Sequence, residues 1–120
     1  MRVKRAEIAA GQGDISALQA VHAEAMVVHN SPLGGDAVGR QALYDQNTIM
    51  FEKAGSTLRL VPYHVVANDE SVLVVARVTG QRDGRVLDQV VLEVWRMAGT
   101  ECVEVWDHFS DQPAWDRFWQ

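Results

Sequence analysis

Two acidic side chains late in the chain, Glu93 and Asp107, have the placement that acid–base chemistry requires. Asp107 follows Val105 and precedes Phe109 in an alternating, strand-like segment, so it shares a face that is otherwise apolar. A carboxylate on such a face is costly unless it is paired or functional. Glu93 lies on the preceding strand-like segment, two residues before Trp95. We therefore predict that Asp107 is the main catalytic acid or base and that Glu93 adjusts it.

The turn between these two segments decides whether the carboxylates meet. A three-residue turn over 99–101 places Glu93 directly opposite Asp107, at about 5 Å. A two-residue turn over 99–100 places Glu93 beside Trp106 instead. We favour the first register because it keeps the valines of the last strand on the face toward the helices. Two carboxylates at that distance would force one pKa upward, which suits proton transfer near neutral pH.

A third charged side chain, Arg77, interrupts an otherwise apolar segment, Leu73–Ala76. A guanidinium there offers a preorganised fork to a carboxylate, and Asp107 is the candidate partner. The alternative is an exposed arginine on the surface of the sheet. The other residues expected to contact a substrate are His29, Asn30, Tyr44, Tyr63, His64 and Trp95.

Several kinds of functional site are not expected from this sequence. The four histidines show no spacing typical of a metal site, and the single cysteine, Cys102, excludes an internal disulfide and any multi-cysteine zinc or iron–sulfur site. There is no glycine-rich phosphate loop and no nucleophile elbow. We expect an activity that uses neither a metal nor a cofactor.

Charge and length restrict the partners. The chain has 120 residues with 11 Lys and Arg against 16 Asp and Glu, a net charge of −5, and its basic residues are scattered. Nucleic-acid binding requires a clustered positive surface, so it is not expected. No apolar run approaches the roughly 20 residues of a membrane span, and the N-terminus lacks the apolar core of a signal peptide. We expect one cytoplasmic domain over residues 1–120.

The elements that must position these residues follow from hydrophobic periodicity. Helical spacing predicts helices over 2–10, from Asp14 as N-cap onward, and over 38–54; alternation predicts strands over 58–67, 71–81, 86–97 and 102–109. A short strand-like run occupies 26–30, and a last helical turn begins at Pro113. The sequence thus predicts an α+β fold in which a cone-shaped, curved antiparallel sheet packs against three N-terminal helices and encloses a hollow.

Five segments, in this order and at this spacing, carry a family resemblance. They are GDISAL at 13–18, VHNSP at 28–32, VGRQAL at 38–43, VWR at 94–96 and EVWDHF at 104–109. The chain resembles the nuclear transport factor 2-like superfamily, in particular SnoaL-like polyketide cyclases, limonene-epoxide-hydrolase-like enzymes and ketosteroid isomerase. The resemblance spans nearly the whole chain.

The resemblance implies roles for individual residues. In the cyclases, a strand residue and the residue after Trp in the last strand form the acid–base pair; here these are Glu93, where a His is often found, and Asp107. In the epoxide-hydrolase-like relatives an Arg lies between two Asp, but Thr79 stands where the first Asp is expected beside Arg77. Asn30 corresponds to an Asn that helps to hold water.

The resemblance implies a cofactor-free acid–base enzyme acting on a small apolar molecule in an internal cavity. Its reaction would be that of a cyclase, isomerase, dehydratase or epoxide-opening hydrolase, on polyketide-like or terpenoid-like substrates. The alternative is a non-catalytic domain of the same fold that binds a small ligand or another protein. In either case Trp106 on the outer sheet face suggests a homodimer.

Overall fold

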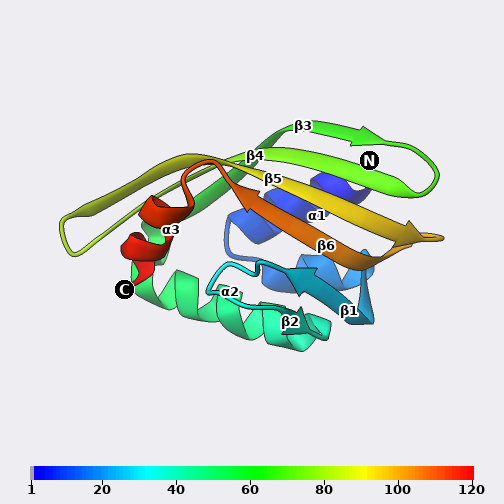
Figure 1. Cartoon of the computed structure of the whole chain (residues 1–120), viewed down its shortest axis with the longest axis horizontal. Coiled ribbons are helices and arrows are strands. Elements are labelled where there is room, and N and C mark those ends of the chain that lie inside the picture. Colours follow the sequence, from blue (N-terminus) through cyan, green and yellow to red (C-terminus); the bar gives the residue numbers. More distant parts are fainter. Residues whose placement is uncertain (1) are drawn as a thin grey trace.

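One curved sheet forms most of the protein, which a computed structural model describes from residue 2 to residue 120. Its strands are β1 (His22–His29), β2 (Ala37–Val38), β3 (Arg59–Ala67), β4 (Ser71–Arg82), β5 (Arg85–Ala98) and β6 (Glu101–Phe109), in the spatial order β2-β1-β6-β5-β4-β3 (Figure 1). The predicted antiparallel meander from β3 to β6 is confirmed. The predicted curved sheet is confirmed; its strands are antiparallel except for β1, which pairs with β6 in parallel and was not anticipated.

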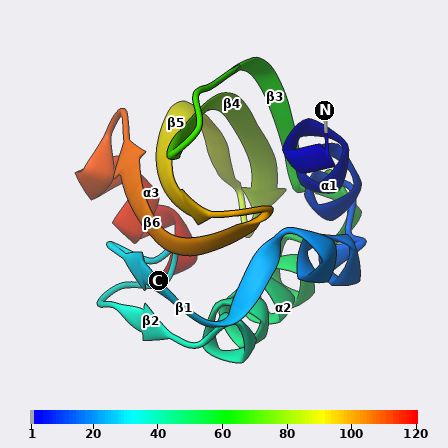
Figure 2. The same ribbon diagram turned by 90° about the vertical axis from the view of Figure 1, so that its right-hand side faces the viewer.

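Helices close the open side of this sheet. They are α1 (Arg2–Gly11), α2 (Arg40–Ala54) and α3 (Gln112–Trp119), with two short 3₁₀ helices, η1 (Ile15–Ala20) and η2 (Gly55–Thr57). Figure 2 shows the strands curling around an interior that α1 and α2 border. The α+β fold is confirmed. The second of the three predicted N-terminal helices is a 3₁₀ helix. Asp14 is its N-cap residue, as predicted, but the Asp14 carboxylate accepts a hydrogen bond from the Ser16 hydroxyl and not from a first-turn amide.

The β5–β6 hairpin brings Glu93 and Asp107 face to face by an unexpected route. Its turn has two residues, 99–100, because Ala98 already pairs with Glu101. That turn alone would leave the carboxylates one residue out of register. A β-bulge early in β6 adds one residue, so Glu93 lies directly opposite Asp107. The predicted pairing is confirmed, whereas the three-residue turn proposed to produce it is wrong.

Helix α1 approaches β3 very closely, and Gly11 at its end makes this approach possible. A Cβ at Gly11 would lie 2.1 Å from the carbonyl oxygen of Leu60, so no other residue fits without a shift. One turn earlier, Glu7 is buried on the same face of α1 as Val3 and Ala10. The tight contact therefore fixes the position of Glu7 above the sheet interior.

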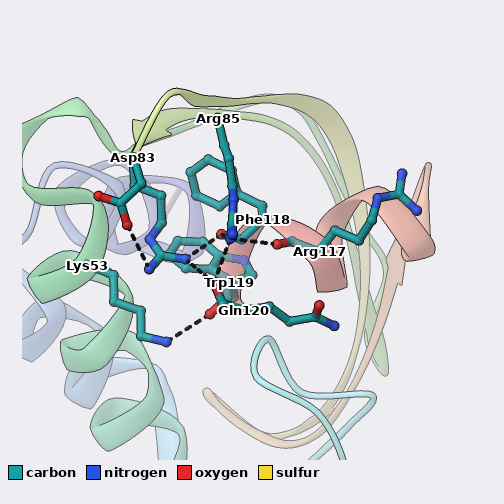
Figure 3. Close-up of polar contacts among 8 residues, drawn as sticks. Lys53, Asp83, Arg85, Arg117, Phe118, Trp119 and Gln120 are labelled. Carbon is teal, nitrogen blue, oxygen red and sulfur yellow. Dashed lines mark hydrogen bonds and ion pairs between the residues drawn. The ribbon is translucent and has the colours of Figure 1, made fainter.

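Helix α3 closes the far end of the interior, and both of its ends are held. At its start the Asp111 carboxylate accepts a hydrogen bond from the backbone N–H of Ala114. At its other end Lys53 and Arg85 donate hydrogen bonds to the main-chain carbonyls of Trp119 and Gln120, as Figure 3 shows. Arg82 donates a further hydrogen bond to the carbonyl of Phe118. Cations suit this end of a helix because its carbonyls lack partners within the helix.

The two core clusters lie at opposite ends of the interior. One includes Leu18, Val28 and Trp95, and the other includes Met50 and Trp115. Among residues 2–120, no helix is long and apolar enough to cross a membrane.

Candidate functional site

A cavity of about 90 Å³ lies between the two core clusters, bordered by α1, α2 and the inner face of the sheet. Most of its wall is apolar or aromatic, and the largest side chains are Met50, Phe51, Trp95, Phe109 and Trp115. An apolar cavity of about 150 Å³ can hold benzene. The cavity found here is smaller, so a molecule with a single ring fits only if lining side chains move, and a larger molecule would require more movement.

Three carboxyl groups, two of them buried and the third, Glu93, half-buried, provide most of the polarity of this cavity, and we call them the carboxyl cluster. Glu7 comes from α1, Glu93 from β5 and Asp107 from β6, and all three line the cavity. Glu7 and Asp107 are each only 5% exposed. The cluster thus assembles residues from the two ends of the chain.

Burial and mutual repulsion shift the titration of the cluster. Burial above all holds the pKa of Glu7 well above its usual range, and the neighbouring charge of Glu93 adds to this shift. Burial likewise raises the pKa of Asp107 well above its usual range, again with a contribution from Glu93. Burial also raises the pKa of Glu93, but hydrogen bonds from Glu7 and Trp95 act in the opposite direction. Glu93 is therefore the member that ionises most readily.

The hydrogen bonds of the cluster assign a role to each member. The indole Nε1 of Trp95 donates to Oε1 of Glu93 at 3.1 Å, and protonated Glu7 donates a second hydrogen bond to the same side chain. These hydrogen bonds favour the ionised form of Glu93 and oppose the effect of burial on its pKa. Oδ1 of Asp107 is buried and has no hydrogen-bond partner within residues 2–120. Asp107 is consequently a carboxyl group whose proton is available to a molecule in the cavity.

A buried histidine, His22, is the other titratable residue of the cavity wall. Its Nδ1 lies 3.1 Å from the Tyr44 hydroxyl, while its Nε2 has no partner among the described residues. Burial, helped by the charge of Arg40, lowers the pKa of His22 to about 4. The imidazole is therefore neutral at pH 7 and cannot compensate the charge of Glu93.

No lysine or arginine is among the cavity-lining residues that the structure describes. Within the same described chain, no group of three or more His, Cys, Asp or Glu side chains is arranged to hold a metal ion. The charge of the carboxyl cluster thus has no cationic partner among the described residues that line the cavity.

Arg77 does not belong to the site. It lies exposed on the outer sheet face, where its Nε and Nη2 donate to the two carboxylate oxygens of Asp88 at 2.9 and 2.7 Å. The expected contact between Arg77 and Asp107 is therefore absent, and the alternative position on the sheet surface is the one observed. Strand alternation explains this placement, because Arg77 follows Ala76, whose side chain faces the core.

Other candidates for substrate contacts also lie outside the cavity lining. Tyr63 and His64 are exposed on β3, and His29 forms contacts with Asp36 and Glu104 at the edge of β1. These three side chains are not among those that border the cavity.

Three further candidates lie in or next to the site. Trp95 lines the cavity. Tyr44 does not line it, but its hydroxyl lies within hydrogen-bond distance of Nδ1 of His22, which does. Asn30 donates a hydrogen bond at 3.1 Å to the main-chain carbonyl of Asp107, so it acts on the backbone that carries the acid. Asn30 adopts a φ of 55°, a left-handed conformation that Asn tolerates better than most residues.

Sequence reasoning missed Glu7 and His22 as members of the site. A helical signal for Glu7 was present, since Val3 and Ala10 share its face at spacings of four and three residues. A carboxylate among apolar neighbours on that face is the same pattern that singled out Asp107. His22 has no comparable signal, because only the packing of β1 against α2 and β6 buries it.

Comparisons with known proteins agree with this architecture. The SnoaL-like domain family matches residues 4–105. Bal32a, from a soil-derived mobile gene cassette, is 30% identical with a TM-score of 0.90, over 99% of this chain and 94% of its own. No curated protein matches the sequence.

More distant solved structures share the fold. A protein from Catenulispora acidiphila with a ketosteroid isomerase-like fold, in complex with trimethylamine, is 17% identical with a TM-score of 0.75, over 88% of this chain and 83% of its own. TerC, co-crystallised with polyporic acid, is 15% identical with a TM-score of 0.81, over 98% and 95%. Since the family match covers most of the chain and the fold agrees throughout, this protein belongs to the SnoaL-like domain family.

Proposed function

We propose that this protein is an acid–base enzyme that acts, without a cofactor, on a small and largely apolar molecule held in the internal cavity. The observation that carries the proposal is the unpartnered, buried Oδ1 of Asp107 opposite Glu93 in an otherwise apolar cavity. A buried polar atom normally has a hydrogen-bond partner, and a substrate oxygen would supply one. The ligands of TerC and of the Catenulispora protein further support small-molecule binding.

In this mechanism Asp107 is the general acid and Glu93 the general base. Glu93 removes a proton from the substrate while Asp107 donates one to the developing oxyanion, so that charge does not accumulate in the dry cavity. In a cyclisation or isomerisation the two transfers balance, and a proton passing from Glu93 back to Asp107 restores the starting state. Dehydration and epoxide opening require the same acid. Trp95 and Glu7 position Glu93 through their hydrogen bonds.

Binding and turnover of small test compounds check this proposal. The panel consists of monocyclic epoxides, enones and phenols, with thermal shift for binding and NMR for conversion. We expect Asp107→Asn to lower kcat at least about 100-fold, the low end of what acid–base catalysis contributes. The same substitution in the exposed β3–β4 turn, Asp69→Asn, should leave kcat unchanged. Conversion that persists in Asp107→Asn would contradict the assignment of the acid.

The second candidate is a ligand-binding domain without catalysis. It is favoured by Thr79 in place of the expected Asp and by the pairing of Arg77 with Asp88 on the outer face. Compounds that raise the melting temperature of the wild type but are never converted would support this function instead.

We also propose that residues 1–120 act as one domain that forms a homodimer through the outer sheet face. This face carries exposed or half-exposed apolar side chains on neighbouring strands, among them Val61, Leu73, Leu92 and Trp106. Exposed apolar side chains on neighbouring strands are typical of a protein–protein contact, and a sheet face is readily self-complementary.

A further inference from the structure

The acidic side chains of the cavity have no positively charged side chain to balance them, and acid–base chemistry on a neutral molecule does not require such an imbalance. Three carboxyl groups converge in it, and none of the described lining residues is a lysine or an arginine. Buried carboxylates usually have a cationic partner or a metal, because an isolated buried charge is expensive. Among the described lining residues His22 is the only basic side chain, and its pKa of about 4 leaves it neutral at pH 7.

The walls around the cluster suit an organic cation rather than an inorganic one. Trp95, Phe109 and Trp115 border the cavity, and aromatic faces attract cations through their negative quadrupole. The remaining lining is mostly aliphatic, which favours a cation that carries a hydrocarbon body. An anionic molecule would meet the carboxylate of Glu93 with no compensating donor of positive charge.

Two unpartnered atoms point independently to a ligand. Oδ1 of Asp107 and Nε2 of His22 are both buried in cavity-lining residues without a hydrogen-bond partner in the described chain. They belong to different strands, β6 and β1. An N–H of an alkylammonium group is a donor that a carboxyl oxygen accepts, and a second polar group of the same molecule could engage His22.

We propose that the cavity binds a small amine in its protonated form, with the ammonium group held by the carboxyl cluster and the hydrocarbon body against the aromatic wall. This inference rests on the proposed function, since it names the substrate class of the same site. The size of the cavity restricts the amine to about one ring.

A distinctive pH dependence follows from this arrangement. The titratable groups that face the ligand are Glu7, Glu93, Asp107 and His22, with Arg40 behind His22. As the pH rises, the cluster loses protons and attracts a cation more strongly, whereas an aliphatic amine keeps its own proton up to about pH 10. Affinity for the amine should therefore increase as the pH rises and the cluster ionises, as long as the amine itself stays protonated. A neutral molecule of the same shape should show no such increase.

The test compares three molecules of one shape that differ in charge: cyclohexylamine, cyclohexanol and cyclohexanecarboxylate. Calorimetric titration of the full chain at pH 8 should show the amine binding at least about tenfold more tightly than the alcohol, which corresponds to about 1.4 kcal/mol. The carboxylate should not bind measurably. Glu93→Gln should reduce the preference for the amine about tenfold, whereas Glu101→Gln, the same change at the exposed start of β6, should leave it unchanged.

The outcomes separate this inference from the function on which it rests. If the alcohol binds as tightly as the amine, or more tightly, the inference is overturned and the proposed function stands. If none of the three binds and none of the panel compounds binds or is converted, both fail. If Glu93→Gln does not fold, wild-type titrations at a series of pH values below the pKa of the amine decide: an affinity for the amine that does not increase anywhere in the series overturns the inference.

Discussion

Glu7 illustrates how one buried carboxyl group links stability to function. Its pKa is raised in the folded protein, chiefly by burial, so the folded state keeps a proton that the unfolded chain releases above about pH 4.3. The folded state binds more protons in this range, and stability therefore falls as the pH rises from about 4 through the folded pKa. Glu93 and Asp107 have shifts of the same sign. The cluster thus costs stability at neutral pH, as expected for groups kept for chemistry.

We expect Glu7→Gln to be more stable than the wild type at pH 8 and less different from it at pH 4. Gln keeps a hydrogen-bond donor toward Glu93 but does not titrate, so the loss of stability with pH should flatten by up to about 1.4 kcal/mol per pH unit. Denaturant unfolding at a series of pH values measures this slope. Glu101→Gln is the control. An unchanged slope in Glu7→Gln would mean that Glu7 titrates normally.

His22 acts with the opposite sign in the same pH series. Its pKa falls from 6.5 to about 4 on folding, so the unfolded chain binds the extra proton between these values. Because His22 is neutral in the folded protein, its contribution to the free energy of unfolding is fully present above pH 6.5. This contribution, up to about 3 kcal/mol, is lost as the pH falls toward 4. In denaturant unfolding at a series of pH values, His22 should therefore lower the free energy of unfolding as the pH falls from 6.5 toward 4.

At the scale of elements, the contact between α1 and β3 decides whether the site exists. Gly11 lets the helix backbone lie against Leu60, and Glu7 depends on that position. Gly80 on β4 provides a comparison, since a Cβ there would meet Leu58 and Phe118 at 3.5 and 3.7 Å, which are ordinary contact distances.

Gly11→Ala should therefore destabilise the protein by about 1–3 kcal/mol, the usual cost of overpacking, and weaken ligand binding in the cavity. Gly80→Ala should change stability by less than about 1 kcal/mol and leave binding unchanged. Chemical denaturation and thermal shift with a bound compound give the two readings. Equal behaviour of the two variants would show that α1 adapts without disturbing Glu7.

At the scale of the whole molecule, the sheet has one face committed to the cavity and one left for association. Leu92 lies on that outer face, opposite Val75 and His108 on the neighbouring strands. Leu92→Arg places a charge at the middle of the proposed dimer contact and should convert a dimer into a monomer in analytical ultracentrifugation. Ile49→Arg, a similar change on the exposed side of α2, should not. A wild type that sediments as a monomer would refute the homodimer.

The sequence by itself determined the strands, most of their pairing and the acidic residue at the centre of the site. Alternating apolar residues define β3 to β6, and short polar turns force neighbouring strands to pair in antiparallel hairpins. Asp107 stood out because it breaks an apolar face. These features can be predicted from the sequence because they depend on residues that are close together in the chain. The family resemblance rested on the same local segments.

Only the tertiary structure decided which other groups meet Asp107. The register with Glu93 depends on a bulge that compensates a shorter turn, and two such one-residue effects cancel without leaving a signal in the sequence. The parallel pairing of β1 with β6 and the docking of α1 bring His22 and Glu7 to a strand from the other end of the chain. Arg77, by contrast, donates hydrogen bonds to Asp88 on the outer face and does not contact Asp107. Contacts between distant segments follow from packing of whole elements, and the pattern within one segment does not contain that information.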